Sequence, residues 1–435
     1  MSFSRVPAIA LVLIGFGLSA GAAVALDAPT TRHHIRVTEK HPSAPHRAAS
    51  NHAAAAKPVA RTASARTAHQ AAPAGEQVRL TTRGRARASA SRAARSAGRR
   101  HHFNERFTAS SFASSNLLAG DITAGEDPVV RQAAIDALGD MNGTAVVIDP
   151  SNGRILAMVN QKLALSPGAE PCSTIKITVA MAALSEGLVT RDTPVQLAGF
   201  RMNMTQALAK SNNLYFEELG RELGFERVRH YANQFGLGEL AGYHIEGEQL
   251  GVYPDHPLSA AEGGVGRMCS FGQGVSLTPL QLGAYVAALA NGGTLYYLQH
   301  PTTPEEAASL TPKVKRTLDI ARYLPDIEDG MAGAVEYGTA RRLRANFNEL
   351  PVFGKTGTCS DKGTRFGWFA SYSESPQGSL VTVFFLEGGR PTFGPRAAEL
   401  TGEFYRNLWD RNWFAAKGQQ DAASLTPAAS QQAQP

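Results

Sequence analysis

A segment of 76 residues, from Asp27 to His102, contains no Phe, Trp or Tyr and only five Leu, Ile or Val residues. A segment with so few large apolar side chains cannot bury enough surface to offset the entropy lost on folding. We therefore predict that residues 27–106 form a disordered Ala/Arg/His-rich linker and that the Ala/Gln-rich stretch 416–435 forms a disordered tail. The folded body is then restricted to residues 107–415, enough for one large domain or two small ones.

The positive charge of the chain lies in this linker and not in the folded body. Residues 27–102 contain 15 Lys or Arg and three Asp or Glu, whereas residues 103–435 carry a formal net charge of −7. The body therefore lacks the basic surface of a nucleic-acid-binding domain, and we expect no nucleic-acid partner. The linker is most simply a solvated spacer, although its basic residues also suit a membrane surface or anionic wall polymers.

The first 26 residues form a targeting segment. A single basic residue, Arg5, is followed by an uncharged stretch of 20 residues from Pro7 to Leu26. This pattern fits a signal peptide cleaved after the small residues Ala23-Val24-Ala25, and it equally fits an uncleaved membrane anchor. Both interpretations predict that the rest of the chain is exported across the cytoplasmic membrane into the cell envelope.

Hydrophobic periodicity predicts strands near both ends of the body and helices between them. The strands are expected at 143–148, 154–159, 352–358, 365–372 and 380–387, and the longer helices at 127–138, 173–186, 278–291 and 395–409, with three short helices between 205 and 235. Thr278 and Gln281 have the spacing of a capping box at the start of one helix. Strands from both ends of the domain predict an α+β fold with one antiparallel sheet of about five strands, covered by helices on both faces.

Ser173-Thr174-Ile175-Lys176 is the first candidate catalytic motif. On a helix, residues i and i+3 share a face, so the lysine amine can reach the serine hydroxyl. A hydroxyl becomes a good nucleophile when a neighbouring base takes its proton, and burial lowers a lysine pKa enough for the amine to act as that base. By itself such a pair occurs often by chance.

Two further polar motifs follow along the chain. Ser211-Asn212-Asn213 stands at a break between helices, where it is more often a helix cap. Lys355-Thr356-Gly357-Thr358 ends a predicted strand, and its lysine and hydroxyl groups suit a carboxylate. A glycine at this place lets a substrate backbone approach closely.

The order of the three motifs resembles that of penicillin-binding proteins and serine β-lactamases: Ser-x-x-Lys, then Ser-x-Asn, then Lys-Thr-Gly. The likeness covers roughly residues 125–412 and includes further segments typical of the penicillin-binding transpeptidase domain. These segments are the hairpin 149–159, the block from Phe271-Gly272-Gln273-Gly274 to Asn291-Gly292-Gly293, the stretch 330–340 and Gly367-Trp368-Phe369.

The resemblance implies an acyl transfer through a covalent serine ester, without a metal or another cofactor. By motif, Ser173 is the nucleophile and Lys176 its base, and Ser211 links Lys176 with Lys355 and relays a proton to the leaving amine. Asn213 is expected to bind the substrate backbone, and Lys355, Thr356, Gly357 and Thr358 the terminal carboxylate. The backbone N–H groups of Ser173 and Thr358 are expected to form the oxyanion hole.

The implied substrates are D-Ala-D-Ala stem peptides of peptidoglycan, with β-lactams as inhibitors and a glycan-polymerising protein as a possible partner. The body has no room for the additional domains of the large synthases.

Two residues depart from the family pattern, because Cys172 replaces the usual Gly and Ile175 the usual aromatic residue. Pro171-Cys172-Ser173-Thr174 is similar to class D β-lactamases and their sensor relatives, whereas Asn213 and the 271–293 block favour a D,D-transpeptidase or carboxypeptidase. A class D-like β-lactamase and a penicillin-binding sensor or scaffold remain alternatives.

Three cysteines, Cys172, Cys269 and Cys359, are too few for a fold framed by disulfides, and their odd number leaves at least one unpaired. Cys172 and Cys359 each adjoin a motif. We expect them to be two small buried thiols, with a redox-sensitive pair as the alternative.

Eight of the 12 histidines lie in the linker and the other four lack the spacing of metal ligands, so we expect no metal site.

Overall fold

A computed structural model describes residues 109–389 and 393–417. The expected signal peptide or anchor, the whole linker and most of the C-terminal tail lie outside the described residues. Within the described part, no helix has both the length and the apolar character needed to cross a bilayer.

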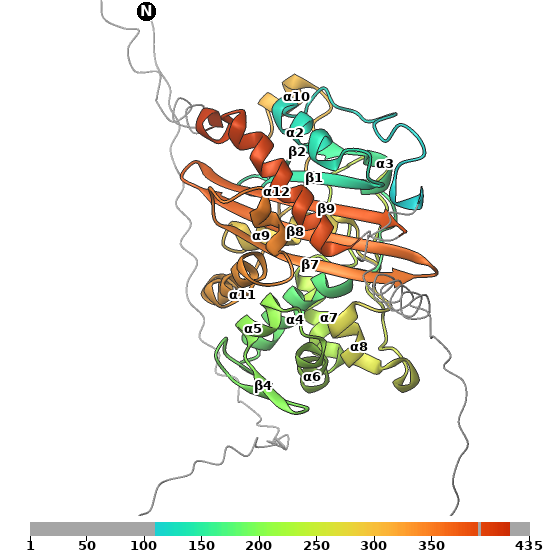
Figure 1. The fold of residues 1–435 in the computed structure, drawn as a ribbon, viewed down its shortest axis with the longest axis vertical. Coiled ribbons are helices and arrows are strands. Elements are labelled where there is room, and N and C mark those ends of the chain that lie inside the picture. Colours follow the sequence, from blue (N-terminus) through green and yellow to red (C-terminus); the bar gives the residue numbers. More distant parts are fainter. Residues whose placement is uncertain (1–108, 390–392, 418–435) are drawn as a thin grey trace, which may run out of the picture. The chain divides into compact units, whose positions relative to one another are not determined.

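An antiparallel five-stranded sheet with the order β2-β1-β9-β8-β7 forms the centre of the body (Figure 1). Its strands are β1 (Gly143–Asp149), β2 (Arg154–Val159), β7 (Val352–Asp361), β8 (Thr364–Ser375) and β9 (Gly378–Gly388). Strands from the two ends of the domain meet where β1 pairs with β9, with Val146 opposite Val383. The predicted α+β fold is therefore confirmed. Strand β7 lies at one edge of the sheet.

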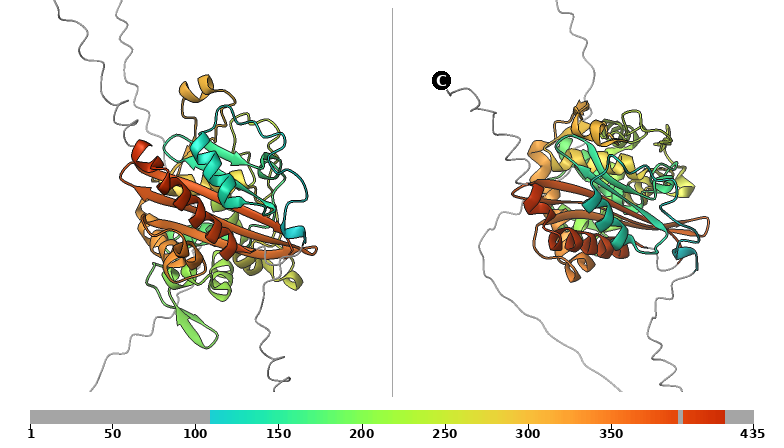
Figure 2. Two further views of the ribbon diagram at one scale, coloured as in Figure 1. Left: turned by 45° about the horizontal axis from the view of Figure 1, so that its top comes forward. Right: turned by 90° about the horizontal axis from the view of Figure 1, so that it is seen from above.

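Helices cover both faces of the sheet (Figures 1 and 2). Side chains of β1 alternate between two hydrophobic clusters, so that Val146 and Ile148 face one cluster and Ala145 and Val147 face the other. The first cluster includes α4 (Lys176–Ser185) and α9 (Pro279–Ala290), and the second includes α2 (Pro128–Leu138) and α12 (Gly394–Asp410). Burial on both sides explains why β1 is buried along its whole length and why its central residues, Ala145 to Ile148, are all apolar and do not alternate with polar ones.

The remaining elements lie mostly between β2 and β7 in the sequence. The helices are α3 (Gln161–Ala164), α5 (Met204–Ala209), α6 (Asn213–Leu223), α7 (Phe225–Gln234), α8 (Gly264–Phe271), α10 (Pro304–Ala308) and α11 (Leu324–Glu336). The 3-10 turns are η1 (Ala109–Ser111), η2 (Cys172–Ile175), η3 (Ala260–Glu262), η4 (Ala321–Tyr323) and η5 (Arg341–Ala345). Two small hairpins pair β3 (Val195–Leu197) with β4 (Phe200–Met202) and β5 (Thr294–Tyr296) with β6 (Val314–Thr317).

Local sequence signals account for several helix boundaries. The capping box of α9 is present, because the Gln281 N–H donates to the Thr278 hydroxyl and the Thr278 N–H donates to the Gln281 side chain. The expected break at Gly224 separates α6 from α7. The prediction of one helix from residue 173 needs a correction, since the chain first makes the 3-10 turn η2 and α4 begins at Lys176. A tighter 3-10 turn is a frequent start for an α-helix.

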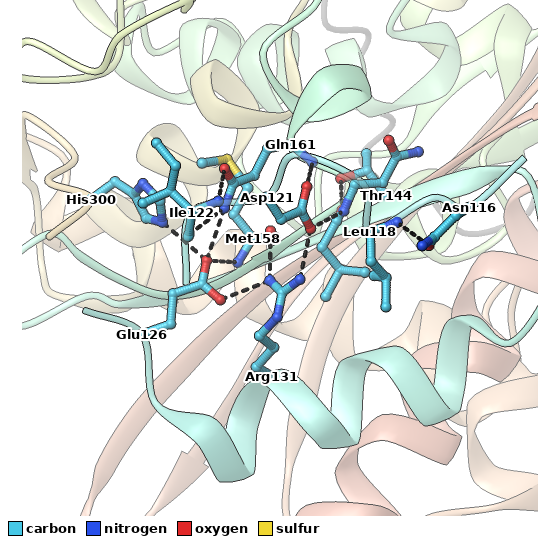
Figure 3. A network of polar contacts seen from close by, with 12 residues as sticks. Asn116, Leu118, Asp121, Ile122, Glu126, Arg131, Thr144, Met158, Gln161 and His300 are labelled. Carbon is cyan, nitrogen blue, oxygen red and sulfur yellow. Dashed lines mark hydrogen bonds and ion pairs between the residues drawn. The ribbon is translucent and has the colours of Figure 1, made fainter. Parts of the chain in front are cut away.

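A buried ionic network fixes the segment before α2 to the end of β2 (Figure 3). The Arg131 guanidinium lies 2.7 Å from the Asp121 carboxylate and 2.8 Å from that of Glu126. The other Glu126 oxygen accepts from the Met158 N–H and lies 3.0 Å from the His300 ring. The side chains of Asp121 and Glu126 are only 3% and 1% exposed, so both carboxylates depend on these partners.

Replacing Arg131 with Met should therefore destabilise the body strongly, because two buried carboxylates lose their cation. We expect the free energy of unfolding to fall by about 3–5 kcal/mol. The matched control is Arg221→Met, which removes an ion pair on α6 whose arginine side chain is 55% exposed. The control should cost less than about 1 kcal/mol. Equal losses for the two variants in urea denaturation would contradict a structural role for the buried network.

Candidate active site

The fold brings the three sequence motifs together from separate parts of the domain. Ser173 lies in η2 and Lys176 opens α4, whereas Ser211 lies in the short connection between α5 and α6. Asn213 is the first residue of α6, and Lys355 lies on the edge strand β7. Residues up to 182 positions apart therefore meet in one site.

The Lys176 amine is surrounded by oxygen atoms. Its Nζ lies 2.7 Å from the Ser173 Oγ and 2.6 Å from the Asn213 side-chain oxygen. It also lies 3.3 Å from both the hydroxyl and the backbone carbonyl oxygen of Ser211. The predicted pair of hydroxyl and amine is thus within hydrogen-bond distance.

The second lysine approaches the same serine from β7. The Lys355 Nζ lies 2.8 Å from the Ser211 Oγ and 2.9 Å from the Thr356 carbonyl oxygen. The Ser211 hydroxyl therefore stands between the two amines, as the relay interpretation requires. Lys176 and Lys355 are both fully buried.

Burial makes both amines weak bases compared with an exposed lysine. Desolvation, followed by repulsion from Lys355, lowers the pKa of Lys176 well below its usual range. Desolvation lowers the pKa of Lys355 to about 7. The cause is the cost of holding a charge away from water. A substantial fraction of the Lys355 amine is consequently neutral near neutral pH, which an exposed lysine would not be.

Two non-glycine residues at the site have left-handed backbone conformations. Cys172, which precedes the candidate nucleophile, has φ = 51°, and Ser211 has φ = 53°. Such conformations are uncommon for residues with a side chain and often occur at functional sites. At Ser211 the turn ends α5 and lets Asn212 cap α6, because the Asn212 side chain accepts from the Tyr215 N–H.

The residues after Lys355 pack closely against the nucleophile turn. A Cβ at Gly357 would lie 2.8 Å from the Pro171 carbonyl oxygen, so the glycine makes room for protein backbone. The sequence analysis expected Gly357 to make room for a substrate backbone. The structure adds a second close approach, that of the protein's own backbone at Pro171. The Thr358 hydroxyl accepts from the Gly394 N–H at 2.9 Å.

One residue of this site had no predicted role. The Thr339 hydroxyl lies 2.6 Å from that of Thr356, and the Thr339 N–H donates to the Ala209 carbonyl oxygen. Thr339 thus joins the Lys-Thr-Gly strand to the end of α5, two residues before Ser211. Its place in Gly338-Thr339-Ala340 marked only a family likeness, and nothing in the sequence shows the contact with Thr356.

The cysteines at the site differ from the expectation. Cys172 and Cys359 form a disulfide, so the prediction of two free thiols was wrong. The chain brings their Cα atoms to 5.5 Å, a usual separation for a disulfide. Cys269 is free and buried. Within residues 109–389 and 393–417, no group of three or more His, Cys, Asp or Glu side chains is arranged to hold a metal ion.

The low pKa of Lys355 predicts that this residue reduces stability at neutral pH. The unfolded chain binds a proton at this amine up to about pH 10.4, whereas the folded protein releases it near pH 7. The folded state therefore binds fewer protons between these values, and the destabilisation is largest at low pH and disappears as pH approaches 10. We expect Lys355→Met to raise the free energy of unfolding by roughly 1–4 kcal/mol at pH 6–7. A pH-independent effect in denaturant titrations would contradict this origin.

Comparison with known proteins places these motifs in a family. The family model "Penicillin binding protein transpeptidase domain" matches residues 143–405. The chain is 28% identical over 316 residues to stage V sporulation protein D of Bacillus subtilis, covering 60% of this chain and 48% of that protein. It is 24% identical over 365 residues to the peptidoglycan D,D-transpeptidase MrdA of Acinetobacter baumannii, covering 64% and 52%. The chain thus spans about half the length of these relatives.

Solved structures support the same fold. The structure of Pseudomonas aeruginosa PBP2 in complex with WCK 5153 superposes with a TM-score of 0.55 at 23% identity, covering 66% of this chain and 74% of that one. A chain from a peptidoglycan synthase complex that coordinates polymerization and crosslinking gives a TM-score of 0.52, also at 23% identity, and covers 66% and 61%. Because the family match spans most of the body, including all three motifs, the chain belongs to the penicillin-binding protein transpeptidase family.

Proposed function

We propose that this protein is a serine D,D-transpeptidase that acts on D-Ala-D-Ala stem peptides of peptidoglycan through an acyl-serine intermediate. One observation carries the proposal: the buried Lys176 amine, with its lowered pKa, lies 2.7 Å from the Ser173 hydroxyl. This is the geometry that a serine nucleophile and its general base need.

The oxygen atoms around Lys176 orient its lone pair. The Asn213 side-chain oxygen and the Ser211 carbonyl oxygen can only accept hydrogen bonds, so a neutral amine directs its two N–H groups at them. The remaining lone pair then faces the Ser173 hydroxyl and takes its proton as the oxygen attacks the carbonyl between the two D-alanines. The backbone N–H groups of Ser173 and Thr358 are the proposed donors to the oxyanion.

The Ser211 hydroxyl completes the proton path. It lies 3.3 Å from the Lys176 amine and 2.8 Å from that of Lys355. It can therefore pass the proton from Lys176 to the departing D-alanine amine, with Lys355 holding the hydroxyl in place. A second stem-peptide amine then attacks the ester and forms the crosslink, while attack by water gives the carboxypeptidase reaction.

The substrate carboxylate is proposed to bind beside Lys355. The Thr358 hydroxyl oxygen accepts from the Gly394 N–H, which leaves its own O–H to donate to the carboxylate. The Thr356 hydroxyl donates to that of Thr339, so we propose that Thr356 supports this binding site by fixing β7 to Thr339. The Asn213 amide N–H group remains for the substrate backbone. Gly357 contributes the close packing of the strand on the turn at Pro171.

The family also suggests where the protein works. We propose that it acts in the cell envelope on the outer side of the cytoplasmic membrane, with β-lactams as inhibitors. A glycan-polymerising protein is the proposed partner, since one structural relative belongs to a complex that coordinates polymerization and crosslinking. The N-terminal segment is proposed to supply the export signal or the anchor.

The nucleophile is tested by labelling with a fluorescent penicillin. Full-length protein should form a covalent adduct on Ser173, and Ser173→Ala should form none. Ser185→Ala, at the other end of the same helical segment, is the matched control and should label like the wild type. Peptide mapping by mass spectrometry identifies the labelled residue. An adduct on another residue, or unchanged labelling of Ser173→Ala, would contradict the assignment.

The lifetime of the adduct separates the proposed function from its alternatives. A D,D-transpeptidase should retain the penicilloyl group for many minutes and process a stem pentapeptide. Loss within seconds would indicate a class D-like β-lactamase. A stable adduct without any reaction on the pentapeptide would indicate a sensor or scaffold.

Binding of the carboxylate by Lys355 predicts a specific pH dependence. The Lys355 ammonium loses its proton above about pH 7, so the attraction to a carboxylate weakens as pH rises. The profile of kcat/KM reports the free enzyme, and for a peptide ending in D-Ala-D-Ala it should fall by up to about tenfold per pH unit above that value. A peptide with a C-terminal amide is the control and should lack this decline. Parallel profiles for the two peptides would place the carboxylate elsewhere.

A further inference from the structure

The disulfide between Cys172 and Cys359 joins the two chain segments that flank the proposed oxyanion hole. Cys172 directly precedes Ser173, and Cys359 directly follows Thr358. The bond spans 187 residues and joins η2 to the edge strand β7. Each proposed oxyanion donor, the N–H of Ser173 and that of Thr358, is therefore the neighbour in sequence of one bridged cysteine.

Apart from the disulfide, these two segments contact each other by van der Waals packing. Within the described residues, no hydrogen bond runs directly from residues 171–175 to residues 357–361. The strand instead packs against the turn where Gly357 meets the Pro171 carbonyl. A hydrogen bond from the neighbouring strand β8 reaches the residue before this turn, since the Trp368 indole N–H donates to the Glu170 carbonyl oxygen at 2.9 Å. The disulfide is thus the direct bonded link between the two donor segments.

The backbone directly before Ser173 has an unusual conformation. Cys172 has φ = 51°, which a residue with a side chain adopts at a cost, and its side chain is only 1% exposed. The Ser173 N–H has no hydrogen-bond partner among the described residues, as expected for a donor reserved for a ligand. The bond to Cys359 ties this residue covalently to β7.

We propose that the Cys172–Cys359 disulfide is a positioning element of the oxyanion hole, which fixes the separation between the N–H groups of Ser173 and Thr358. The inference rests on the proposed acyl-serine function. Donors stabilise the oxyanion when they stand about 2.7–3.1 Å from it, so a small relative shift of η2 and β7 weakens one or both hydrogen bonds. Lys176 and Ser173 share one continuous helical segment and keep their contact when the bridge opens.

The third cysteine, Cys269, does not compete with Cys172 and Cys359 for the disulfide. Cys269 is fully buried, and desolvation raises the pKa of its thiol to about 12. Its side chain packs against α6 at Gly220. A buried protonated thiol is a poor partner for thiol–disulfide exchange, so a reductant acts on the Cys172–Cys359 bond alone.

The test compares the full-length protein with its bridge closed and open. Dithiothreitol opens the bond by reducing it to two thiols while the dithiol is oxidised to its cyclic disulfide. Alkylation and mass spectrometry first establish that Cys172 and Cys359 are blocked before reduction and react with iodoacetamide after it. Cys359→Ser provides the open form without a reductant, and dithiothreitol should leave the rate of this variant unchanged. Cys269→Ala is the matched control, in which the closed bridge should preserve the wild-type rate.

Three quantities are measured: the acylation rate by a fluorescent penicillin, the infrared carbonyl stretch of the acyl-ester, and the midpoint of thermal unfolding. We expect opening the bridge to lower the acylation rate at least about tenfold, since complete loss of one oxyanion donor costs about 10²–10³. Affinity for the unreacted penicillin should change little. The ester carbonyl band should shift to higher frequency because its hydrogen bonds weaken.

The outcomes separate the possible failures. If the open form acylates at the wild-type rate with an unshifted carbonyl band, the positioning role is wrong even when the unfolding midpoint falls, and the disulfide is only a structural cross-link. If both thiols react with iodoacetamide before reduction, the bridge itself is absent and the inference is overturned. If the closed form gives no adduct on Ser173, the proposed function fails, and with it the basis of this inference.

Discussion

Removal of the Lys176 amine from water is the physical condition on which the proposed chemistry depends. An ammonium group with its ordinary pKa would be charged at neutral pH and unable to accept a proton from Ser173. Helix α4 opens with this residue and buries it completely, and the nearby Lys355 disfavours a second positive charge. The Ser173 hydroxyl lies 2.7 Å from this amine, whose pKa is lowered well below its usual range.

This condition explains several features of the fold around the site. Two buried amines need oxygen acceptors, and the left-handed turn at Ser211 supplies a hydroxyl and a carbonyl oxygen at one point. The edge strand β7 brings Lys355 to the other side of that hydroxyl. Because the sheet is formed by both ends of the domain, the helices between them enclose the site. Stability lost by burying lysines is offset by the two large hydrophobic clusters on the faces of the sheet.

The sequence predicted those parts of the structure that local patterns encode. The hairpin of β1 and β2, the capping box of α9 and the breaks around α6 follow from turn and cap residues. Helices α8 and α11 were not predicted because each contains two glycines, which lower helix propensity. In α11 the structure shows the reason for one of these glycines. A Cβ at Gly330 would lie 2.6 Å from the Leu208 side chain, so the glycine permits close packing of α11 on α5.

The site was predictable as a set of residues but not as a geometry. Three motifs in order indicate which side chains meet, whereas the contact between Thr339 and Thr356 depends on how α11 packs. The Cys172–Cys359 bond likewise joins residues that no local pattern relates, and three cysteines alone do not specify a pair. Long-range contacts of this kind arise from tertiary packing and leave no signal in a short window of sequence.

The titration of Lys176 tests the central claim most directly. In protein labelled with ¹³C and ¹⁵N lysine, its side-chain resonances can be assigned by their absence in Lys176→Arg and followed by NMR from pH 5 to 11. We expect a midpoint well below 10.5. A midpoint near 10.5 would leave Ser173 without a base and would contradict the account.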